Sequence, residues 1–277
     1  MSASTQTEAT VPPAAASAAS AAPAQGLGRH SHALDNIITI AKREITGYFA
    51  SPVAYVFIVI FLLLAGFFTF MVGKFFDRHE ASLSSFFVWH PWLYLFLVPA
   101  VGMRLWSEER RLGTIELLLT MPVTAWQAIV GKFAASWAFL ALALALTFPM
   151  VITVCYLGKP DLGVMFCGYV GSVFLAGAYL AISCMTSAIT RNQVISFILS
   201  VVACLFLILA GWPPVTELFS QWAPNWLVEF VAGFSVMPHF ESVQRGVLDS
   251  RDLTFFLSLI VFSLFTTGVI IRSHRAG

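Results

Sequence analysis

The sequence predicts an all-α membrane protein with about six transmembrane helices, an N-terminal amphipathic helix, a short charged helix on the cytoplasmic side and a short exterior helical cap before the last span. Three observations predict this fold. The chain of 277 residues is 58% hydrophobic and only 10% charged, and its mean hydropathy is +0.84. Its apolar residues also lie in long runs. A soluble domain carries about 25% charged residues, so this surface must largely face lipid.

The N-terminal part divides into two segments of different composition. Residues 1–33 are rich in Ala, Ser, Pro and Thr, and they predict a disordered tail because they offer too little apolar surface to repay ordering. Residues 34–52 predict an amphipathic interfacial helix that Asp35 caps and Ser51-Pro52 ends. Its apolar stripe consists of Ile37, Ala41, Ile45 and Tyr48. A plain juxtamembrane extension is the alternative.

Residues 53–277 predict the transmembrane domain. A membrane-spanning helix needs about 20 apolar residues. Segments of that length are Val53–Gly73, Phe86–Leu105, Phe133–Leu157, Val164–Ile189, Val194–Trp212 and Leu253–Ile271. The fourth repeats small residues every four positions, as in Gly163, Cys167 and Gly171, which predicts a helix packed inside the bundle.

Lysines and arginines in the short loops predict the orientation. They concentrate on the side that holds both termini, which predicts two cytoplasmic ends. Residues 213–252 then lie outside as a cap. Their tryptophans and prolines favour short helices at the outer membrane interface, and a small cap packed on the bundle is the alternative.

The cytoplasmic connection at residues 107–122 reads SEERRLGTIELLLTMP. We expect Gly113 to end a first helical turn, Thr114 to cap a second turn and Pro122 to stop it. Thr124 and Gln127 form a capping-box pattern that starts the next span. The segment therefore predicts a short helix parallel to the membrane. Its charged side chains are available to a partner: Glu108, Glu109, Arg110 and Glu116. The alternative is that these charges only set topology, but acids contribute little to topology.

This segment resembles the signature of ABC type-2 transporter permeases, the membrane subunits of ATP-driven exporters. The resemblance lies in Glu109-x-x-x-Gly113-Thr114-x-Glu116-x-Leu118-Leu119-x-x-Pro122, followed by Ile129-x-Gly131-Lys132. It implies that residues 107–122 are the coupling helix, which docks on the ATPase through Glu108, Glu109, Arg110, Gly113, Thr114, Glu116 and Pro122. The stretch Ile37–Pro52 is similar to the elbow helix of that family.

The exterior stretch HFESVQRGVLD resembles the gliding-motility (GldF-like) branch through His239, Phe240, Arg245, Gly246 and Asp249. The family resemblance implies an ABC ATPase partner and a second permease subunit, identical or different. It implies no cofactor in this chain, with ATP and Mg on the partner ATPase. An exterior or periplasmic accessory protein is a further candidate partner. The expected location is a bacterial inner membrane, where the chain would serve substrate export or mechanical work.

Other functions find less support in the sequence. No G-x-x-x-x-G-K-[ST] phosphate loop occurs, so we expect no nucleotide site of its own. No basic stripe is present, so nucleic acid is not expected as a partner. The predicted spans hold no charged residue in their interiors, which disfavours coupling to a proton or sodium gradient. Glu108-Glu109 lacks the arginine of an intramembrane hydrolase, because Gly113 stands in its place. No metal or catalytic site is predicted, and a membrane anchor or scaffold without transport remains the main alternative.

Overall fold

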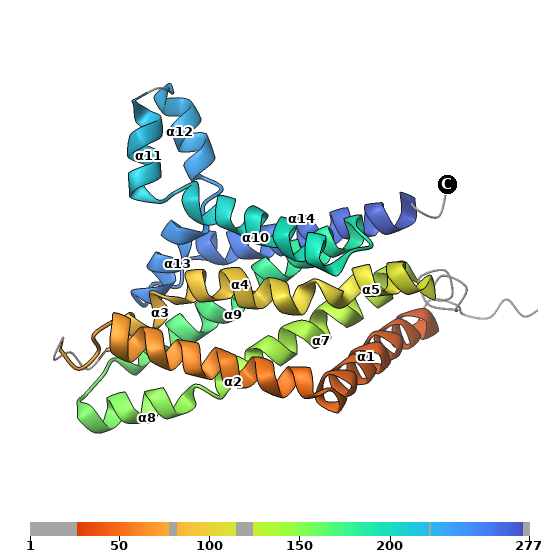
Figure 1. Cartoon of the computed structure of the whole chain (residues 1–277), viewed down its shortest axis with the longest axis horizontal. Coiled ribbons are helices and arrows are strands. Elements are labelled where there is room, and N and C mark those ends of the chain that lie inside the picture. Colours follow the sequence, from red (N-terminus) through yellow and green to blue (C-terminus); the bar gives the residue numbers. More distant parts are fainter. Residues whose placement is uncertain (1–26, 78–81, 115–123, 222, 274–277) are drawn as a thin grey trace, which may run out of the picture.

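The computed structural model describes residues 27–77, 82–114, 124–221 and 223–273. These residues form an elongated bundle of helices without strands, which confirms the predicted all-α membrane fold (Figure 1). The helices are α1 (Leu27–Ala50), α2 (Pro52–Phe67), η1 (Phe68–Val72), α3 (Ser84–Phe87), α4 (His90–Gly102), α5 (Arg104–Leu112), α7 (Ala125–Ala145), α8 (Phe148–Leu157), α9 (Leu162–Ile189), α10 (Gln193–Leu209), α11 (Pro213–Ser220), α12 (Asn225–Ala232), α13 (Val236–Gln244) and α14 (Ser250–Ser273).

The central helix of the bundle is α9, which packs against α4, α7, α10, α13 and α14. Its small residues let these neighbours approach closely. A Cβ added at Gly171 would lie 2.7 Å from Val243, and one added at Gly177 would lie 2.8 Å from the Trp137 ring. In lipid, such close packing takes the place of the hydrophobic effect as the force between helices. The prediction of an internal packing helix is therefore confirmed.

Four helical segments are long and apolar enough to cross a membrane. They are Pro52–Val72, Ala125–Leu157, Leu162–Ile189 and Ser250–Ser273, and the bent pair α10 and α11 raises the number to five. The predicted count of six is not confirmed. The second predicted span begins in α3 and continues through α4, which has 13 residues and is therefore only about 20 Å long.

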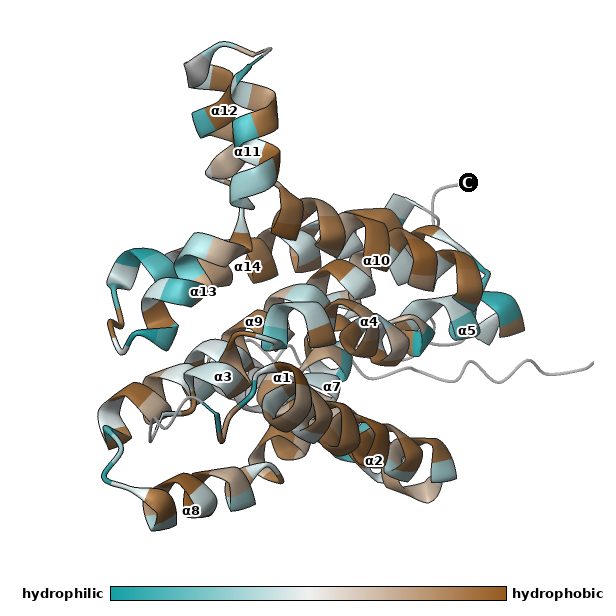
Figure 2. Ribbon diagram, turned by 60° about the vertical axis from the view of Figure 1, so that its left-hand side comes forward, coloured by the Kyte–Doolittle hydropathy of each residue, from teal (hydrophilic) through white to brown (hydrophobic). Residues whose placement is uncertain are grey.

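The outer surface of the bundle is apolar over α2, α10 and α14, as Figure 2 shows by hydropathy. Large side chains on α2 are half or more exposed, among them Val59 at 54% and Leu63 at 67%. In water such a patch would be costly, whereas lipid chains solvate it. The chain is thus a multi-pass membrane protein.

The N-terminal helix α1 differs from the prediction in length. It begins at Leu27, so the last seven residues of the predicted tail 1–33 are helical and Asp35 lies inside α1 instead of capping it. The rest of that predicted tail lies outside the described residues. α1 ends at Ala50, where Ser51 caps α2 through the N–H of Val53.

α1 packs closely against α7, and its predicted position in the headgroup layer stays a prediction. The Tyr48 ring stacks on Phe139 with centroids 5.1 Å apart. Further along, a Cβ added at Gly131 of α7 would lie 2.9 Å from Ile40 Cγ2. α1 is therefore part of the bundle, and the absence of a side chain at Gly131 sets how closely α1 approaches α7.

The region 213–252, which is predicted to lie outside, contains two different structures. α13 packs on α9 and α14 as a cap, with Phe240 fully buried. The hairpin of α11 and α12 projects away from the bundle (Figures 1 and 2). Its exposed apolar side chains include Trp226 at 68% and Phe230 at 62%. α13 thus matches the alternative of a small cap packed on the bundle. The position of α11 and α12 at the membrane interface stays a prediction.

The contact at Gly131 predicts how two glycine substitutions differ. Gly131→Ala should lower the thermal unfolding temperature in detergent, because its Cβ would meet the branched Cβ of Ile40 at 3.0 Å and overpacking costs about 1–3 kcal/mol. The matched control is Gly47→Ala on α1, where nothing lies within 4 Å. That change should leave the unfolding temperature equal or higher, because Ala favours helix by about 1 kcal/mol. Equal effects of the two changes would contradict the close approach.

Candidate functional site

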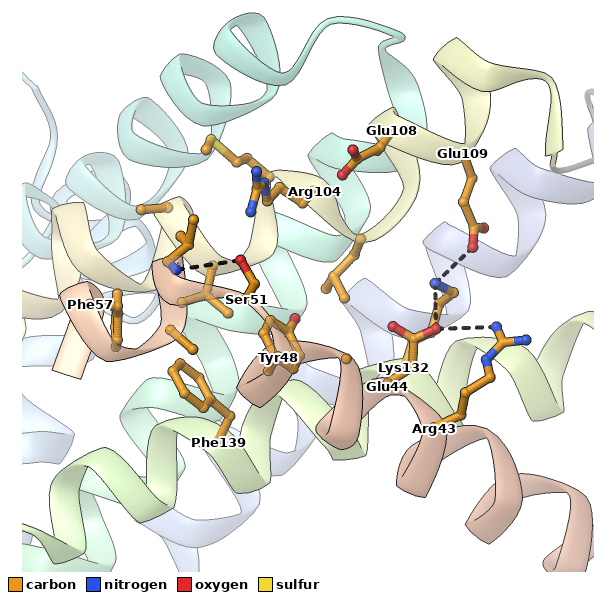
Figure 3. Close-up of a pocket in the computed structure, with 17 residues that line it drawn as sticks. Arg43, Glu44, Tyr48, Ser51, Phe57, Arg104, Glu108, Glu109, Lys132 and Phe139 are labelled. Atoms are coloured by element: carbon orange, nitrogen blue, oxygen red, sulfur yellow. Dashed lines mark hydrogen bonds and ion pairs between the residues drawn. The ribbon is translucent and has the colours of Figure 1, made fainter.

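A cluster of charged side chains around the buried Lys132 joins three helices at the end of the bundle where α1 and α5 lie (Figure 3). The Lys132 ammonium of α7 is 2.8 Å from Glu109 Oε1 of α5 and 3.1 Å from Glu44 Oε1 of α1. Arg43 also contacts Glu44, at 3.4 Å. We call these four residues the Lys132 cluster. The Lys132 side chain is only 6% exposed and those of Glu44 and Glu109 are 22% and 20% exposed, whereas Arg43 is 66% exposed and reaches solvent.

The register of α1 against α7 brings this cluster together. Glu44 meets Lys132, and one turn later Tyr48 hydrogen-bonds Ser136 with their hydroxyls 2.9 Å apart. Tyr48 follows Glu44 by four residues, and Ser136 follows Lys132 by four residues. The two contacts therefore lie on successive turns of both helices. Burial raises the pKa of the Tyr48 phenol above its usual value, so this hydroxyl stays neutral and takes part as a hydrogen-bonding group.

The charges of the Lys132 cluster balance. Two carboxylates face one ammonium, and Arg43 supplies the second positive charge. Beneath the ammonium lies the Trp106 ring, with its centroid 5.6 Å from Nζ, which adds a cation–π contact. Glu109 Oε2 is buried, and no described residue hydrogen-bonds it. Breaking a buried pair of this kind costs about 3–5 kcal/mol because it leaves a charge uncompensated.

The same helix α5 is attached to the C-terminal end of α9. Ser187 Oγ accepts hydrogen bonds from the backbone N–H groups of Trp106 and Ser107, each at 3.0 Å, and donates one to the Met103 carbonyl at 2.9 Å. These contacts satisfy backbone groups at Met103, where α4 ends and α5 begins. Arg110 donates a hydrogen bond to the Ala188 carbonyl. Any displacement of α5 is therefore transmitted to α9.

The end of α5 at Gly113 follows the prediction, whereas the predicted cap of a second turn by Thr114 stays a prediction because residues 115–123 lie outside the described ranges. Gly113 adopts a left-handed conformation with φ of 72° and its N–H bonds the Glu109 carbonyl, which ends the helix. Thr114 Oγ1 reaches the same carbonyl at 3.4 Å. Residues 115–123 lie outside the described residues, and with them Glu116 and Pro122. Helix α7 then begins with the predicted capping box of Thr124 and Gln127, which is confirmed.

The predicted docking residues thus have different surroundings. Glu109 faces inward on Lys132, Arg110 caps α9, and Glu108 remains partly exposed. Their contact with an ATPase stays a prediction. Sequence reasoning did not predict that Glu44 and Lys132 belong to the site. The sequence did offer one signal for this site, because Lys132 stands directly before a long apolar run. A lysine inside an apolar helix is seldom buried without a partner of opposite charge.

Beside the Lys132 cluster lies a cavity of about 660 Å³ between α1, α2, α7 and the junction of α4 with α5 (Figure 3). Its polar side includes Arg104 and Glu108, and its apolar side includes Val53, Phe57 and Phe139. A space of this size is typical of sites for small molecules.

The predicted exterior motif lies near the opposite end of the bundle from the Lys132 cluster, and two of its residues, His239 and Phe240, hold α13 against its neighbours. His239 Nδ1 is 2.6 Å from Asp252 Oδ1, so the histidine pairs with this residue of α14 and not with Glu241. Arg245 pairs with Glu241 at 3.5 Å, and Asp249 accepts the Arg251 N–H at the start of α14. Phe240 is buried, and Gly246 has φ of 89°. Within the described ranges, no group of three or more His, Cys, Asp or Glu residues is placed to hold a metal ion.

A comparison with protein families gives one match. Residues 92–225 match the family described as "ABC-2 family transporter protein", a range that extends from α4 to the start of α12 and covers slightly less than half of the chain. Over this range the chain is similar to ABC type-2 permeases. This match supports the predicted ABC type-2 permease family, whose members are membrane subunits generally without a nucleotide site of their own. The gliding-motility branch stays a prediction. A search of curated proteins found no match.

The Lys132 cluster of this permease-like chain predicts a large effect of one substitution. Lys132→Met should lower the free energy of unfolding by about 3 kcal/mol or more, because two carboxylates lose their shared cation. Thermal unfolding in detergent measures the effect. Arg111→Met is the control, since Arg111 is exposed on α5. Adding Glu109→Gln to Lys132→Met should restore part of the lost stability, and a double variant no more stable than Lys132→Met would contradict this assignment.

The left-handed Gly113 predicts a purely conformational effect. A Cβ at this position has no neighbour within 4 Å among the described residues, so the strained φ is the effect that the structure predicts for Gly113→Ala. We expect a loss of about 1 kcal/mol, and Gly113→Asn should lose less because Asn tolerates this conformation. The unfolding temperatures of the two variants test this prediction. A lower unfolding temperature for Gly113→Asn than for Gly113→Ala would contradict a helix end at Gly113.

Proposed function

We propose that this chain is the permease subunit of an ABC type-2 exporter and that a separate ATPase subunit supplies the energy. The single observation that carries the proposal is the Lys132 cluster, which ties α5 to the elbow helix α1 and to α7. α5 leads directly into the segment expected to dock on the ATPase. The family match over residues 92–225 supports the same conclusion.

The proposed mechanism follows from these attachments. Closure of the ATPases on ATP displaces the coupling segment that follows Gly113. α5 carries this displacement to α1 and α7 through Lys132 and to α9 through Ser187 and Arg110. Because α9 packs against most of the bundle and against α13, the motion reaches the exterior cap. The pathway or lever then changes shape without a charge crossing the bilayer.

The partners in this proposal are one ABC ATPase and a second permease subunit for each functional unit, with ATP and Mg bound by the ATPases. The family generally works with such partners. The chain resides in a bacterial inner membrane with both termini in the cytoplasm. Figure 1 is consistent with that orientation, since the start of α1 and the end of α14 lie at the same end of the bundle. Export of a lipophilic or lipid-anchored cargo suits the apolar spans.

Co-expression with the ATPase of the native host tests this function. Glu116→Lys in the expected docking segment should abolish co-purification of the ATPase, because the reversed charge removes an electrostatic contact. The control is Glu241→Lys in the exterior α13, which should leave the ATPase bound. Retention of the ATPase by the Glu116→Lys variant would refute the docking role of this segment. Purification of a stable complex without any nucleotide-binding subunit would instead favour a membrane anchor.

A further inference from the structure

The charges around the 660 Å³ cavity do not all have partners. Six charged side chains line it, of which the four in the Lys132 cluster neutralise one another. The remaining two are Arg104 and Glu108, one turn apart on α5. Neither forms an ion pair within 4 Å with any described residue. The cavity is thus neutral overall and presents one free cation beside one free anion (Figure 3).

The opposite side of the cavity is apolar and open to the surface of the bundle. Ala54 and Phe139 are buried there, whereas Val53 is 52% exposed. Val53 and Phe57 belong to the first two turns of α2, which is a candidate membrane span with an apolar outer surface. The end of a span is the depth at which lipid headgroups meet hydrocarbon. The cavity therefore joins a headgroup-like polar side to a lipid-facing apolar side.

We propose that this cavity binds a zwitterionic phospholipid with a primary amine, of the phosphatidylethanolamine class, as a lipid ligand. The phosphate pairs with Arg104, the ammonium donates hydrogen bonds to Glu108, and the acyl chains lie along Val53 and Phe57. Arginine is suited to phosphate because its planar guanidinium donates two hydrogen bonds at once. The proposal goes beyond the permease function and does not depend on the ATPase.

Charge complementarity selects this class among the common lipids. A phosphatidylglycerol headgroup carries the phosphate charge but brings no cation for Glu108, which repels it. A phosphatidylcholine headgroup carries a quaternary ammonium, which has no N–H to donate and leaves the carboxylate without a hydrogen bond. A phosphoethanolamine headgroup satisfies both side chains.

Native mass spectrometry of the purified full-length chain tests the proposal. The protein is mixed with equal amounts of dioleoyl phosphatidylethanolamine, phosphatidylcholine and phosphatidylglycerol. Phosphatidylethanolamine should be retained about tenfold better than either other lipid, since one charge-assisted hydrogen bond contributes about that factor. Equal retention of the three lipids by the unmodified chain would overturn the proposal, because it indicates unselective boundary lipid.

Two variants assign the headgroup contacts. Glu108→Gln should reverse the preference toward phosphatidylglycerol, because the repulsive carboxylate is gone. Arg104→Gln should lower phosphatidylethanolamine retention about tenfold, whereas Arg104→Lys keeps the charge and should retain most of the binding. The control Arg111→Gln changes an exposed arginine of α5 that does not line the cavity, and it should change nothing. An unchanged lipid preference in both Glu108→Gln and Arg104→Gln would exclude this site.

A water-soluble probe separates the headgroup from the lipid. Glycerophosphoethanolamine, which lacks acyl chains, should not displace the bound lipid at equal concentration, because it cannot use the apolar wall. Displacement at equal concentration would show that the apolar wall contributes nothing and would overturn the assignment of a lipid. Because no ATPase is present in these measurements, their outcome is separate from that of the co-purification test.

Discussion

The arrangement of this end of the molecule depends on one ammonium group held between two carboxylates. Lys132 lies in a helix that is otherwise apolar enough to cross a membrane, and an isolated charge there would cost several kcal/mol. The cost is offset only because Glu44 arrives from α1 and Glu109 arrives from α5. Three helices must therefore hold their relative positions. The missing side chain at Gly131 and the stacking of Tyr48 on Phe139 serve the same close approach.

The junction between α4 and α5 gives this constraint a functional direction. α4 ends at Gly102 and α5 begins at Arg104, and Ser187 of α9 supplies hydrogen bonds to backbone groups at this junction. α5 is consequently bound on one side to the Lys132 cluster and on another to the end of the central helix. A short segment held at two places acts as a rigid lever. In the proposed function, the ATPase acts on that lever.

The lipid cavity follows from the same geometry. α1 ends at Ala50, and α2 follows as a separate helix capped by the Ser51 hydroxyl. The space between these helices and α5 is filled partly by the balanced charges of the Lys132 cluster and partly by two charges without partners. A lipid bound to Arg104 and Glu108 sits on the lever itself, so the proposed ligand and the proposed coupling motion meet on one helix.

The sequence by itself determined the membrane class, the helical content, the helix end at Gly113, the capping box at Thr124 and the internal position of α9. These features depend on local chemistry: apolar run length, the left-handed conformation that glycine permits, and small residues at helical spacing. Only the tertiary structure decided which charges meet. Glu44, Glu109 and Lys132 are far apart in the chain, and no local pattern states that α1 packs on α7 or that Glu109 turns inward. The division of the second predicted span at Met103 likewise depends on Ser187, which lies 84 residues further along the chain.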